Sequence, residues 1–240
     1  MGPFLRIHPN FVFIRKYQKY FVFVVKRLKG FKIQVATLYF LTQFIFTMSK
    51  RVYIIHGWGG NPNEGWLVWL GKELKNRGFE VFIPEMPDTW LPKIHKWVSK
   101  ISEVVGKSDV QTYFVGHSIG CQAVMRYLEQ LPQDQRAGGA IFVAGWFNLT
   151  DETWDETYTK ETADEWVNTP INFKVIKEHT DNLVLINSDN DPYVPMSDVE
   201  LFKKNFSINV IILKNKGHIT EEDNVVELPV VLGELLKMAQ

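Results

Sequence analysis

The 240-residue chain contains one cysteine, Cys121, and carries no net charge at neutral pH. A single cysteine excludes an internal disulfide bond and is typical of proteins from a reducing compartment. The sequence has no internal repeat and no low-complexity segment, which excludes a repeat architecture. Gly57, Gly59 and Gly60 lack the spacing of a dinucleotide fingerprint or a phosphate-binding loop. The chain is therefore neither a disulfide scaffold nor a solenoid, and this turn is not a phosphate cradle.

Acidic residues are also absent from the first 47 positions, which carry eight basic and twelve aromatic side chains. Without those eight, the chain has 19 basic residues against 27 acidic ones, so its zero net charge is a cancellation between two regions. We therefore divide the chain into a basic, aromatic extension, residues 1–47, and one domain, residues 48–240.

From Met48 onward, runs typical of strands alternate with runs typical of helices. The strand-like runs lie near 51–56, 79–84, 112–116, 139–144, 183–187 and 209–214. The helical patterns lie near 65–77, 91–106, 119–131, 197–205 and 224–239. This alternation predicts an α/β fold, with a mostly parallel sheet covered by helices on both faces.

The pentapeptide Gly116-His117-Ser118-Ile119-Gly120 lies between a strand-like run and a helical pattern. G-x-S-x-G at such a turn is the pattern that presents a serine hydroxyl as a nucleophile. The two glycines let the strand and the helix pack closely. Cys121 follows directly and is a second candidate nucleophile, although a small buried side chain is its more ordinary role. Ser118 is the predicted nucleophile.

A nucleophilic serine needs a histidine base and a carboxylate that orients the base, and this motif takes them in the order serine, acid, histidine. Only His179 and His218 lie downstream of Ser118. His218 follows the strand-like run 210–213, and loops at such strand ends carry catalytic groups. His179 lies in a polar stretch and is expected at the solvated surface. His218 is therefore the predicted base.

The acid is expected after the strand-like run 183–186, in the polar segment 187–195. Pro192 restricts the backbone of Asp191 and so fixes the direction of its carboxylate, whereas Asp189 is suited to hydrogen-bonding local amides. The segment lacks the glycine and the distal glutamate of a calcium loop, so no metal site is predicted. We favour Asp191 as the acid and keep Asp189 as the alternative.

A glycine-rich turn, His56–Gly60, follows the first strand-like run. An oxyanion hole takes one backbone N–H from the residue after the nucleophile and one from a loop after an early strand. Ile119 and Trp58 occupy these two places in the sequence. His56 and His117 are expected to shape the loop and the elbow by hydrogen bonds.

These segments together resemble a known family. From Met48 onward the chain is similar to the α/β-hydrolases, and more narrowly to the small serine hydrolases grouped with retinoblastoma-binding protein 9 and bacterial YdeN. The resemblance is carried by the segments 51–60, 116–121, 188–195 and 217–218. It implies one compact domain with a serine triad of Ser118, Asp191 and His218. It does not identify the substrate, because one fold hosts many activities.

Residues 147–177 interrupt the alternation with seven acidic residues against three lysines. We interpret this segment as a small lid, and a solvated acidic surface excursion is the alternative. Carboxylates in a lid would disfavour anionic substrates, while aromatic side chains would form apolar walls. The predicted substrate contacts are Trp58, His117, Trp146 and Trp166.

The predicted activity is acyl transfer through an acyl-enzyme, which needs no metal or organic cofactor. The expected substrate is a small neutral or cationic ester or amide. We expect no nucleic-acid partner and no stable membrane association for residues 48–240, and a cytoplasmic location; no protein partner is predicted. A non-catalytic interaction module on the same scaffold is the alternative.

Three interpretations of residues 1–47 are open. A membrane anchor or export signal is disfavoured, because the uncharged run 33–49 is short and contains five Gln and Thr side chains. A basic nucleic-acid-binding tail lacks a recognised module. The favoured interpretation is a translation start at Met48, because the hydrolase-like sequence begins there.

A chain that begins at Met48 is expected to be soluble, to unfold in one cooperative transition and to keep the full activity of the 240-residue chain. The measurements are thermal unfolding by circular dichroism and hydrolysis of a p-nitrophenyl ester. Aggregation of the shorter chain, loss of its activity, or recovery of the intact native protein in membranes would show that the extension belongs to the working protein.

Overall fold

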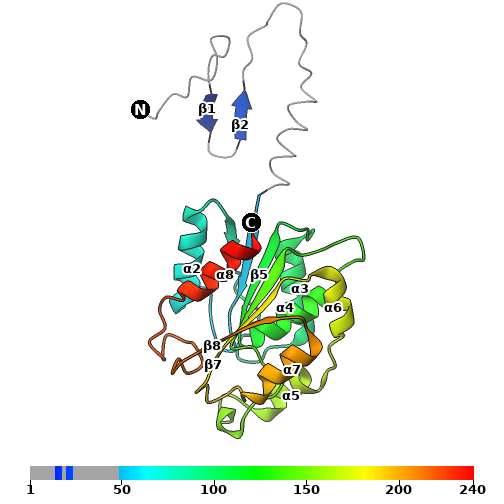
Figure 1. Cartoon of the computed structure of the whole chain (residues 1–240), viewed down its shortest axis with the longest axis vertical. Helices are drawn as coiled ribbons and strands as arrows, with labels where there is room; N and C mark the ends of the chain where they lie inside the picture. Colours follow the sequence, from blue (N-terminus) through cyan, green and yellow to red (C-terminus); the bar gives the residue numbers. More distant parts are fainter. Residues whose placement is uncertain (1–13, 18–19, 24–48) are drawn as a thin grey trace, which may run out of the picture. The chain divides into compact units, whose positions relative to one another are not determined.

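A computed structural model of the chain describes residues 14–17, 20–23 and 49–240 (Figure 1). Contacts divide the chain into two compact units, Met1–Met48 and Ser49–Gln240. The described part of the first unit is an antiparallel pair of strands, β1 (Ile14–Tyr17) and β2 (Tyr20–Phe23). The predictions about residues 1–47 and a start at Met48 fall for the most part outside the described residues.

The second unit is built around a six-stranded sheet in which every pair of neighbouring strands is parallel. In the order of the sheet, its strands are β4 (Glu80–Phe82), β3 (Arg51–Ile55), β5 (Thr112–His117), β6 (Gly139–Val143), β7 (Leu183–Ser188) and β8 (Asn209–Leu213). The predicted α/β class with a parallel sheet is confirmed, and each predicted strand is present.

Seven α-helices and one short 3-10 helix occur among residues 49–240. They are α2 (Gly65–Asn76), α3 (Ile94–Val105), α4 (Ile119–Glu129), η1 (Asp151–Thr153), α5 (Lys160–Asn168), α6 (Phe173–His179), α7 (Ser197–Asn205) and α8 (Pro229–Met238). All five helical patterns of the sequence are confirmed. The predicted lid, residues 147–177, contains η1, α5 and most of α6. None of the helices in this part of the chain combines the length and the hydropathy that crossing a bilayer takes.

Alternate residues of each strand enter opposite faces of the sheet, which gives the unit two apolar cores. In β3, Tyr53 and Ile55 enter the core covered by α3, α4, α6 and α7, whereas Val52 and Ile54 enter the core covered by α2 and α8 (Figure 1). Both faces of the sheet are therefore buried. This explains why the strand sequences are continuous apolar runs rather than alternating apolar and polar residues.

The chain reverses its direction of travel across the sheet at β3. The strand β4 is added on one side of β3, and the next strand, β5, is added on the other side. Crossovers between parallel strands are right-handed, so the reversal sends α2 to one face and α3 to the other. The loops that leave the carboxyl ends of β3 and β5 diverge at this point, where open α/β sheets bind ligands. Trp58 and Ser118 lie directly after these two strand ends.

The start of α4 approaches the sheet so closely that its flanking glycines have no room for a side chain. A Cβ added at Gly116 would lie 2.6 Å from the backbone nitrogen of Cys121, and one added at Gly120 would overlap the carbonyl oxygen of Ile55. The prediction that these glycines allow close packing of strand and helix is confirmed. Any larger residue would push the turn away from β3.

Gly120→Ala is expected to lower the free energy of unfolding by about 3 kcal/mol, because the obstructing atom is backbone and cannot rotate away. Gly233 is the matched control. It lies inside α8 with no atom within 4 Å of an added Cβ, so Gly233→Ala should stabilise the protein by about 0.5–1 kcal/mol. Urea unfolding followed by circular dichroism measures both. Equal stabilities of the two variants would contradict the close packing.

Candidate active site

Ser118 lies in a turn whose backbone conformation L-residues rarely adopt, with φ 53° and ψ −122°. Such a conformation costs of order 1–3 kcal/mol and persists only where the surroundings impose it. Here the Ser118 N–H donates to the carbonyl of Val143 at 2.9 Å, and the Ser118 carbonyl accepts from the N–H of Cys121 at 2.9 Å. The side chain is 8% exposed, and no hydrogen bond joins its hydroxyl to another residue of the described part of the chain.

The carboxylate beside His218 belongs to Asp191. Nδ1 of His218 lies 2.8 Å from Oδ2 of Asp191, and the two side chains are 12% and 1% exposed. Oδ1 of Asp191 accepts the N–H groups of Tyr193 at 2.9 Å and Val194 at 3.1 Å. The carboxylate is held in one orientation by these amides, and it holds the proton of the neutral imidazole on Nδ1. In that tautomer Nε2 of His218 is an acceptor, and it forms no hydrogen bond with another residue of the described part.

Asp189 faces a different group. Its Oδ2 lies 2.8 Å from Nζ of Lys214, and its Oδ1 accepts the N–H of Asn215 at 2.9 Å. These hydrogen bonds, with that of Lys214 the stronger, hold the pKa of Asp189 below its usual range. Asp191, and not Asp189, is the aspartate placed against His218.

Two residues without a sequence motif also join the loops that follow β7 and β8. Oγ of Ser188 accepts the N–H of Lys216 at 2.9 Å and donates to Oδ1 of Asn190 at 2.8 Å. Oδ1 of Asn190 also accepts the N–H of Gly217 at 3.0 Å. Four consecutive residues, 188–191, therefore hold the loop that carries His218. The only signal in the sequence was a polar run after an apolar strand, because the partners are main-chain groups that β7–β8 pairing brings near.

The main chain of this loop is held from the elbow. Nε2 of His117 donates to the carbonyl of His218 at 2.9 Å, and Nε1 of Trp66 donates to the carbonyl of Ile219 at 2.9 Å. Ile219 has a φ of 59°, which is unfavourable for a β-branched residue. Two side-chain donors therefore hold a strained turn directly beside His218. The sequence predicts that His117 shapes the elbow, but its hydrogen bond instead holds the loop of His218.

His117 is neutral in the folded protein. Complete burial, followed by the nearby His218, lowers the pKa of His117 to about 3. A neutral ring that donates through Nε2 carries no proton on Nδ1. The Nε2 donor of His117 is already bonded to the His218 carbonyl. A contact between His117 and a substrate therefore stays a prediction.

His56 orients the loop after β3. Its Nδ1 donates to the carbonyl of Gly57 at 2.9 Å, and its Nε2 accepts the N–H of Met86 at 3.1 Å. Burial lowers the pKa of His56, so this ring is also neutral. The C=O and N–H of one trans peptide point in opposite directions. The bond to Gly57 therefore turns the N–H of Trp58 away from His56.

Two backbone donors beside Ser118 have no partner among the described residues. Neither the N–H of Trp58 nor that of Ile119 donates to another described residue. Ile119 is the first residue of α4, so its N–H has no partner within the helix. The loop of Trp58 lies against the elbow, because a Cβ added at Gly57 would contact Cβ of Ser118 at 3.5 Å. These are the two donors that the sequence predicted for an oxyanion hole.

His179 is buried, which corrects the expectation of a solvated histidine. It is 3% exposed at the end of α6, and its Nδ1 donates to the carbonyl of Gln135 at 2.8 Å. Its own carbonyl accepts the N–H of Ala137, two residues before β6 begins. This position is at the amino ends of the strands, opposite Ser118. The residues around His179 are polar, so no local pattern indicated that α6 packs against α4.

Trp146 and Trp166 are packing residues in this structure. Each is 1% exposed, Trp166 packs edge-on against Trp97, and its Nε1 donates to the carbonyl of Pro92 at 2.9 Å. Side chains buried this deeply have no exposed face for a substrate. The proposed site therefore does not include Trp146 and Trp166 as substrate contacts. Trp166 instead anchors α5, and with it the predicted lid, to the core.

Cys121 is also a packing residue. The thiol is fully buried, and its sulfur lies 3.2 Å from the carbonyl oxygen of Gly116 and 3.3 Å from that of Val143. Burial raises the pKa of the Cys121 thiol far above its usual range, which disfavours the reactive thiolate.

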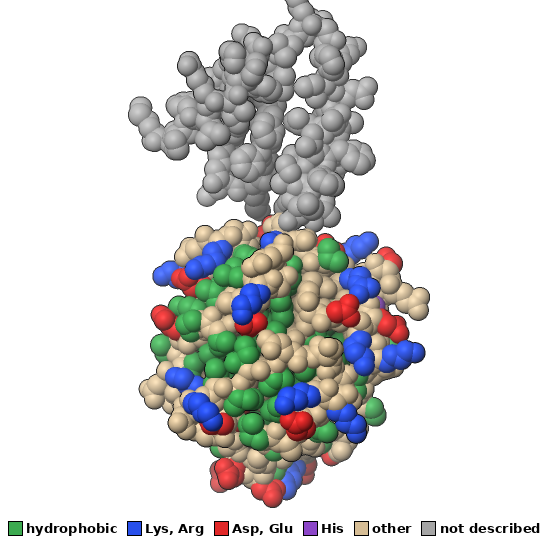
Figure 2. All heavy atoms as spheres, in the orientation of Figure 1, with side chains coloured by type: hydrophobic (Ala, Val, Ile, Leu, Met, Phe, Trp, Pro, Cys, Tyr) green, Lys and Arg blue, Asp and Glu red, His purple; other side chains and the backbone are tan. Residues whose placement is uncertain are grey.

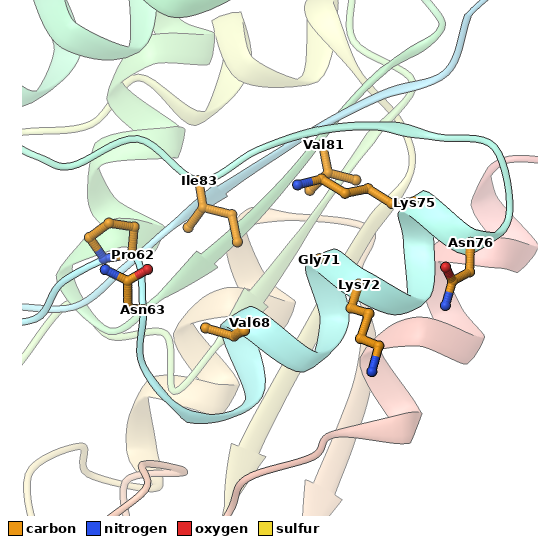
Figure 3. Close-up of a pocket in the computed structure, with 9 residues that line it drawn as sticks. All are labelled: Pro62, Asn63, Val68, Gly71, Lys72, Lys75, Asn76, Val81 and Ile83. Carbon is orange, nitrogen blue, oxygen red and sulfur yellow. The ribbon is translucent and has the colours of Figure 1, made fainter.

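Two hollows on the surface of residues 49–240 lie away from Ser118, Asp191 and His218. One is an open groove of about 580 Å³ between α2 and β4, lined by residues that include Val68, Lys72 and Val81 (Figure 3). Hydrophobic side chains gather, between charged ones, on the face that carries α2 and α8 (Figure 2). This groove lies beside the open edge of β4 and contains no nucleophile, so it is not the candidate active site.

The family model described as "Serine hydrolase" matches residues 52–237 of this chain. The chain belongs to the serine hydrolase family. The rat serine hydrolase RBBP9 is 25% identical over 171 residues, which cover 70% of this chain and 86% of RBBP9. YdeN of Bacillus subtilis, described as a candidate hydrolase, is 29% identical over 188 residues, which cover 78% of this chain and 95% of YdeN.

Solved structures agree with this membership. The crystal structure of YdeN superposes with a TM-score of 0.72, at 28% identity, and covers 79% of this chain and 98% of that one. Est1E of Butyrivibrio proteoclasticus shares the fold, with a TM-score of 0.56 at 18% identity over 78% of this chain and 89% of Est1E. The predicted α/β-hydrolase fold and serine hydrolase family are confirmed, and the protein is a hydrolase.

This serine hydrolase is expected to lose stability as the pH falls below about 6.5. In the unfolded chain His117 binds a proton with a pKa of about 6.5, whereas in the folded protein it does so only near 3. The unfolded state therefore takes up protons first. Stability falls with pH through this window, by up to about 1.4 kcal/mol per pH unit for this histidine.

The measurement is urea unfolding between about pH 7.5 and 5.5. His117→Gln, which removes the titrating ring and keeps a side-chain donor, should have a shallower pH dependence than the wild type. His95→Gln, an exposed change on α3, is the control and should keep the wild-type slope. An unchanged slope in His117→Gln would contradict the assignment.

Proposed function

We propose that this serine hydrolase cleaves a carboxylic ester or amide bond of a small molecule through an acyl-enzyme, with Ser118 as nucleophile, His218 as base and Asp191 as the orienting acid. The observation that carries the proposal is the buried pair of His218 Nδ1 and Asp191 Oδ2, 2.8 Å apart. A histidine held in this way presents its second ring nitrogen for the proton of the serine.

The reaction proceeds in two halves. Nε2 of His218 takes the proton of the Ser118 hydroxyl as Oγ attacks the carbonyl carbon of the substrate. The N–H groups of Trp58 and Ile119 donate to the oxyanion. The imidazolium then gives its proton to the leaving alcohol or amine, and an acyl-serine remains. Water, deprotonated by His218, attacks the acyl-serine and releases the acid, which restores the serine hydroxyl.

Three further features support this mechanism. The strained backbone of Ser118 is typical of a residue held for function. The two proposed oxyanion donors have no other partner among the described residues. The Ser118 hydroxyl is likewise unpartnered, and in unliganded enzymes the bond between nucleophile and base often tightens only when substrate binds. A non-catalytic interaction module would give no reason for this combination.

A fluorophosphonate probe tests the proposal directly. We expect stoichiometric labelling at Ser118 in the wild type and none in Ser118→Ala. Asp191→Asn is expected to lower the turnover of a p-nitrophenyl ester by roughly four orders of magnitude, because the amide favours the wrong tautomer of His218. Its melting temperature should remain close to that of the wild type. The double variant Ser118→Ala with Asp191→Asn should be no slower than Ser118→Ala alone, since the residues act as one unit.

Asp189→Asn is the matched control, because it makes the same chemical change two residues away in the same loop. It should keep turnover within a few-fold of the wild type. A folded but inactive Asp189→Asn together with an active Asp191→Asn would make Asp189 the acid. A folded wild type that neither reacts with the probe nor turns over the ester would favour the interaction module.

A further inference from the structure

Four aromatic side chains lie in segments that follow the carboxyl ends of four different strands, the end of the sheet at which Ser118 and His218 also lie. Trp58 follows β3, Trp90 follows β4, Tyr158 follows β6 and Tyr193 follows β7. The ring of Tyr158 lies 5.3 Å from that of Trp58 and 5.9 Å from that of Trp90. Tyr193 meets the imidazole of His218 edge to face at 5.1 Å. Trp90 is 52% exposed and Tyr193 is 37% exposed.

We call these four side chains the aromatic wall. The contacts of Trp90 show that the wall is held in place. Nε1 of Trp58 donates to the carbonyl of Trp90 at 3.1 Å, and the N–H of Gly59 donates to the carbonyl of Thr89 at 2.9 Å. The Trp90 ring covers Gly59 so closely that an added Cβ would lie 2.6 Å from it. A large, exposed aromatic surface fixed beside a reactive centre is typical of a ligand contact.

Four carboxylates surround the same region. Asp155 accepts the N–H groups of Thr157 and Tyr158 at 2.6 and 2.7 Å, so it lies against the main chain of Tyr158. The others are Glu64, in the loop after β3, and Glu221 and Glu222, in the loop after His218. None of the four forms an ion pair with another described residue. Glu221 reaches back to the N–H of Gly65 at 3.1 Å, which brings the two loops together.

Glu222 follows His218 by four residues, in the loop whose His218 ring meets Tyr193 at 5.1 Å. After burial itself, the charge of Glu222 is the next cause that raises the pKa of Tyr158 and of Tyr193. Lysines in the neighbouring loops balance only part of this charge. Lys214 pairs with Asp189 and Lys160 pairs with Asp151, which leaves the exposed Lys216 against the four carboxylates. Negative potential and aromatic faces therefore coincide.

The mechanism decides which part of the substrate meets this wall. His218 must donate its proton to the leaving group, so the leaving group lies against His218 and hence beside Tyr193. Aromatic faces together with unpaired carboxylates are the chemistry that recognises an ammonium ion. We propose that the leaving group of the substrate is an alcohol or amine that carries a positive charge, recognised by Tyr193 and Tyr158 with Glu222. This proposal rests on the proposed function.

Two esters that differ only in charge test the proposal. Propionylcholine and 3,3-dimethylbutyl propionate have the same acyl group and nearly the same shape, and hydrolysis of each releases propionate and an alcohol. We expect kcat/KM to be about tenfold higher for the choline ester. Glu222→Gln should lower this ratio, and so should Tyr193→Leu, whereas Tyr193→Phe should preserve it. Added salt should lower the ratio, because exposed carboxylates are screened.

Glu103→Gln is the matched control, because it removes one exposed carboxylate near the carboxyl end of α3, and it should leave the ratio unchanged. The free alcohols give a second measurement that does not depend on the acyl group. Choline should protect Ser118 from the fluorophosphonate probe at lower concentrations than 3,3-dimethylbutanol does.

Equal kcat/KM for the two esters, or equal protection by the two alcohols, would overturn the charge preference while the proposed function stands. A ratio that Glu222→Gln leaves unchanged would remove Glu222 from it. Failure of the wild type to cleave either ester or to react with the probe would instead overturn the proposed function.

Discussion

The close contact between the start of α4 and β3, across Gly120, determines the geometry of the candidate active site. Because no side chain separates the two elements, the chain must turn from β5 into α4 at a single residue, and that residue is Ser118. The same turn leaves the Ile119 N–H at the start of a helix, without a partner. It also directs His117 towards the carbonyl of His218. One packing constraint therefore sets the positions of Ser118, the Ile119 N–H and the support of the His218 loop together.

Histidine has two separate tasks in this serine hydrolase. His56 and His117 are buried, their pKa values are lowered by desolvation, and each makes fixed hydrogen bonds as a neutral ring. They orient the peptide of Trp58 and the main chain of His218. His218 is instead paired with a carboxylate and keeps one nitrogen free. Burial without a counter-charge makes a structural donor, whereas burial beside Asp191 makes a candidate base.

The segment between β6 and β7 connects the core to the substrate side of the site. Trp166 fixes α5 in the core by packing against Trp97, while Tyr158, two residues before α5, meets Trp58 on the loop after β3. The tryptophan expected to touch the substrate therefore acts as an anchor. Tyr158, which is not among the predicted substrate contacts, belongs to the aromatic wall instead. Because an aromatic residue anchors this acidic segment in the core, the segment can place negative charge near the site while it remains folded.

The sequence by itself determined the class of fold and predicted Ser118 as the nucleophile. Both depend on local patterns: apolar runs long enough for buried strands, and glycines on each side of Ser118 where strand meets helix. The order of nucleophile, acid and base along the chain also limited the acid to Asp189 or Asp191 and favoured His218. Only the tertiary structure shows that Asp191 lies against His218 while Asp189 lies against Asn215, because that difference depends on how one loop meets the end of β8.

The tertiary structure alone also decided the burial of His179, Trp146 and Trp166 and the supporting bonds of Ser188 and Asn190. Burial depends on what packs against a residue from distant parts of the chain, and no local pattern carries that information. The residue type of the partner does not indicate a hydrogen bond to its main chain, since nearly all residues have the same N–H and C=O groups. The sequence therefore specified the candidate residues of the site, and the packing of parallel strands determined which of them meet.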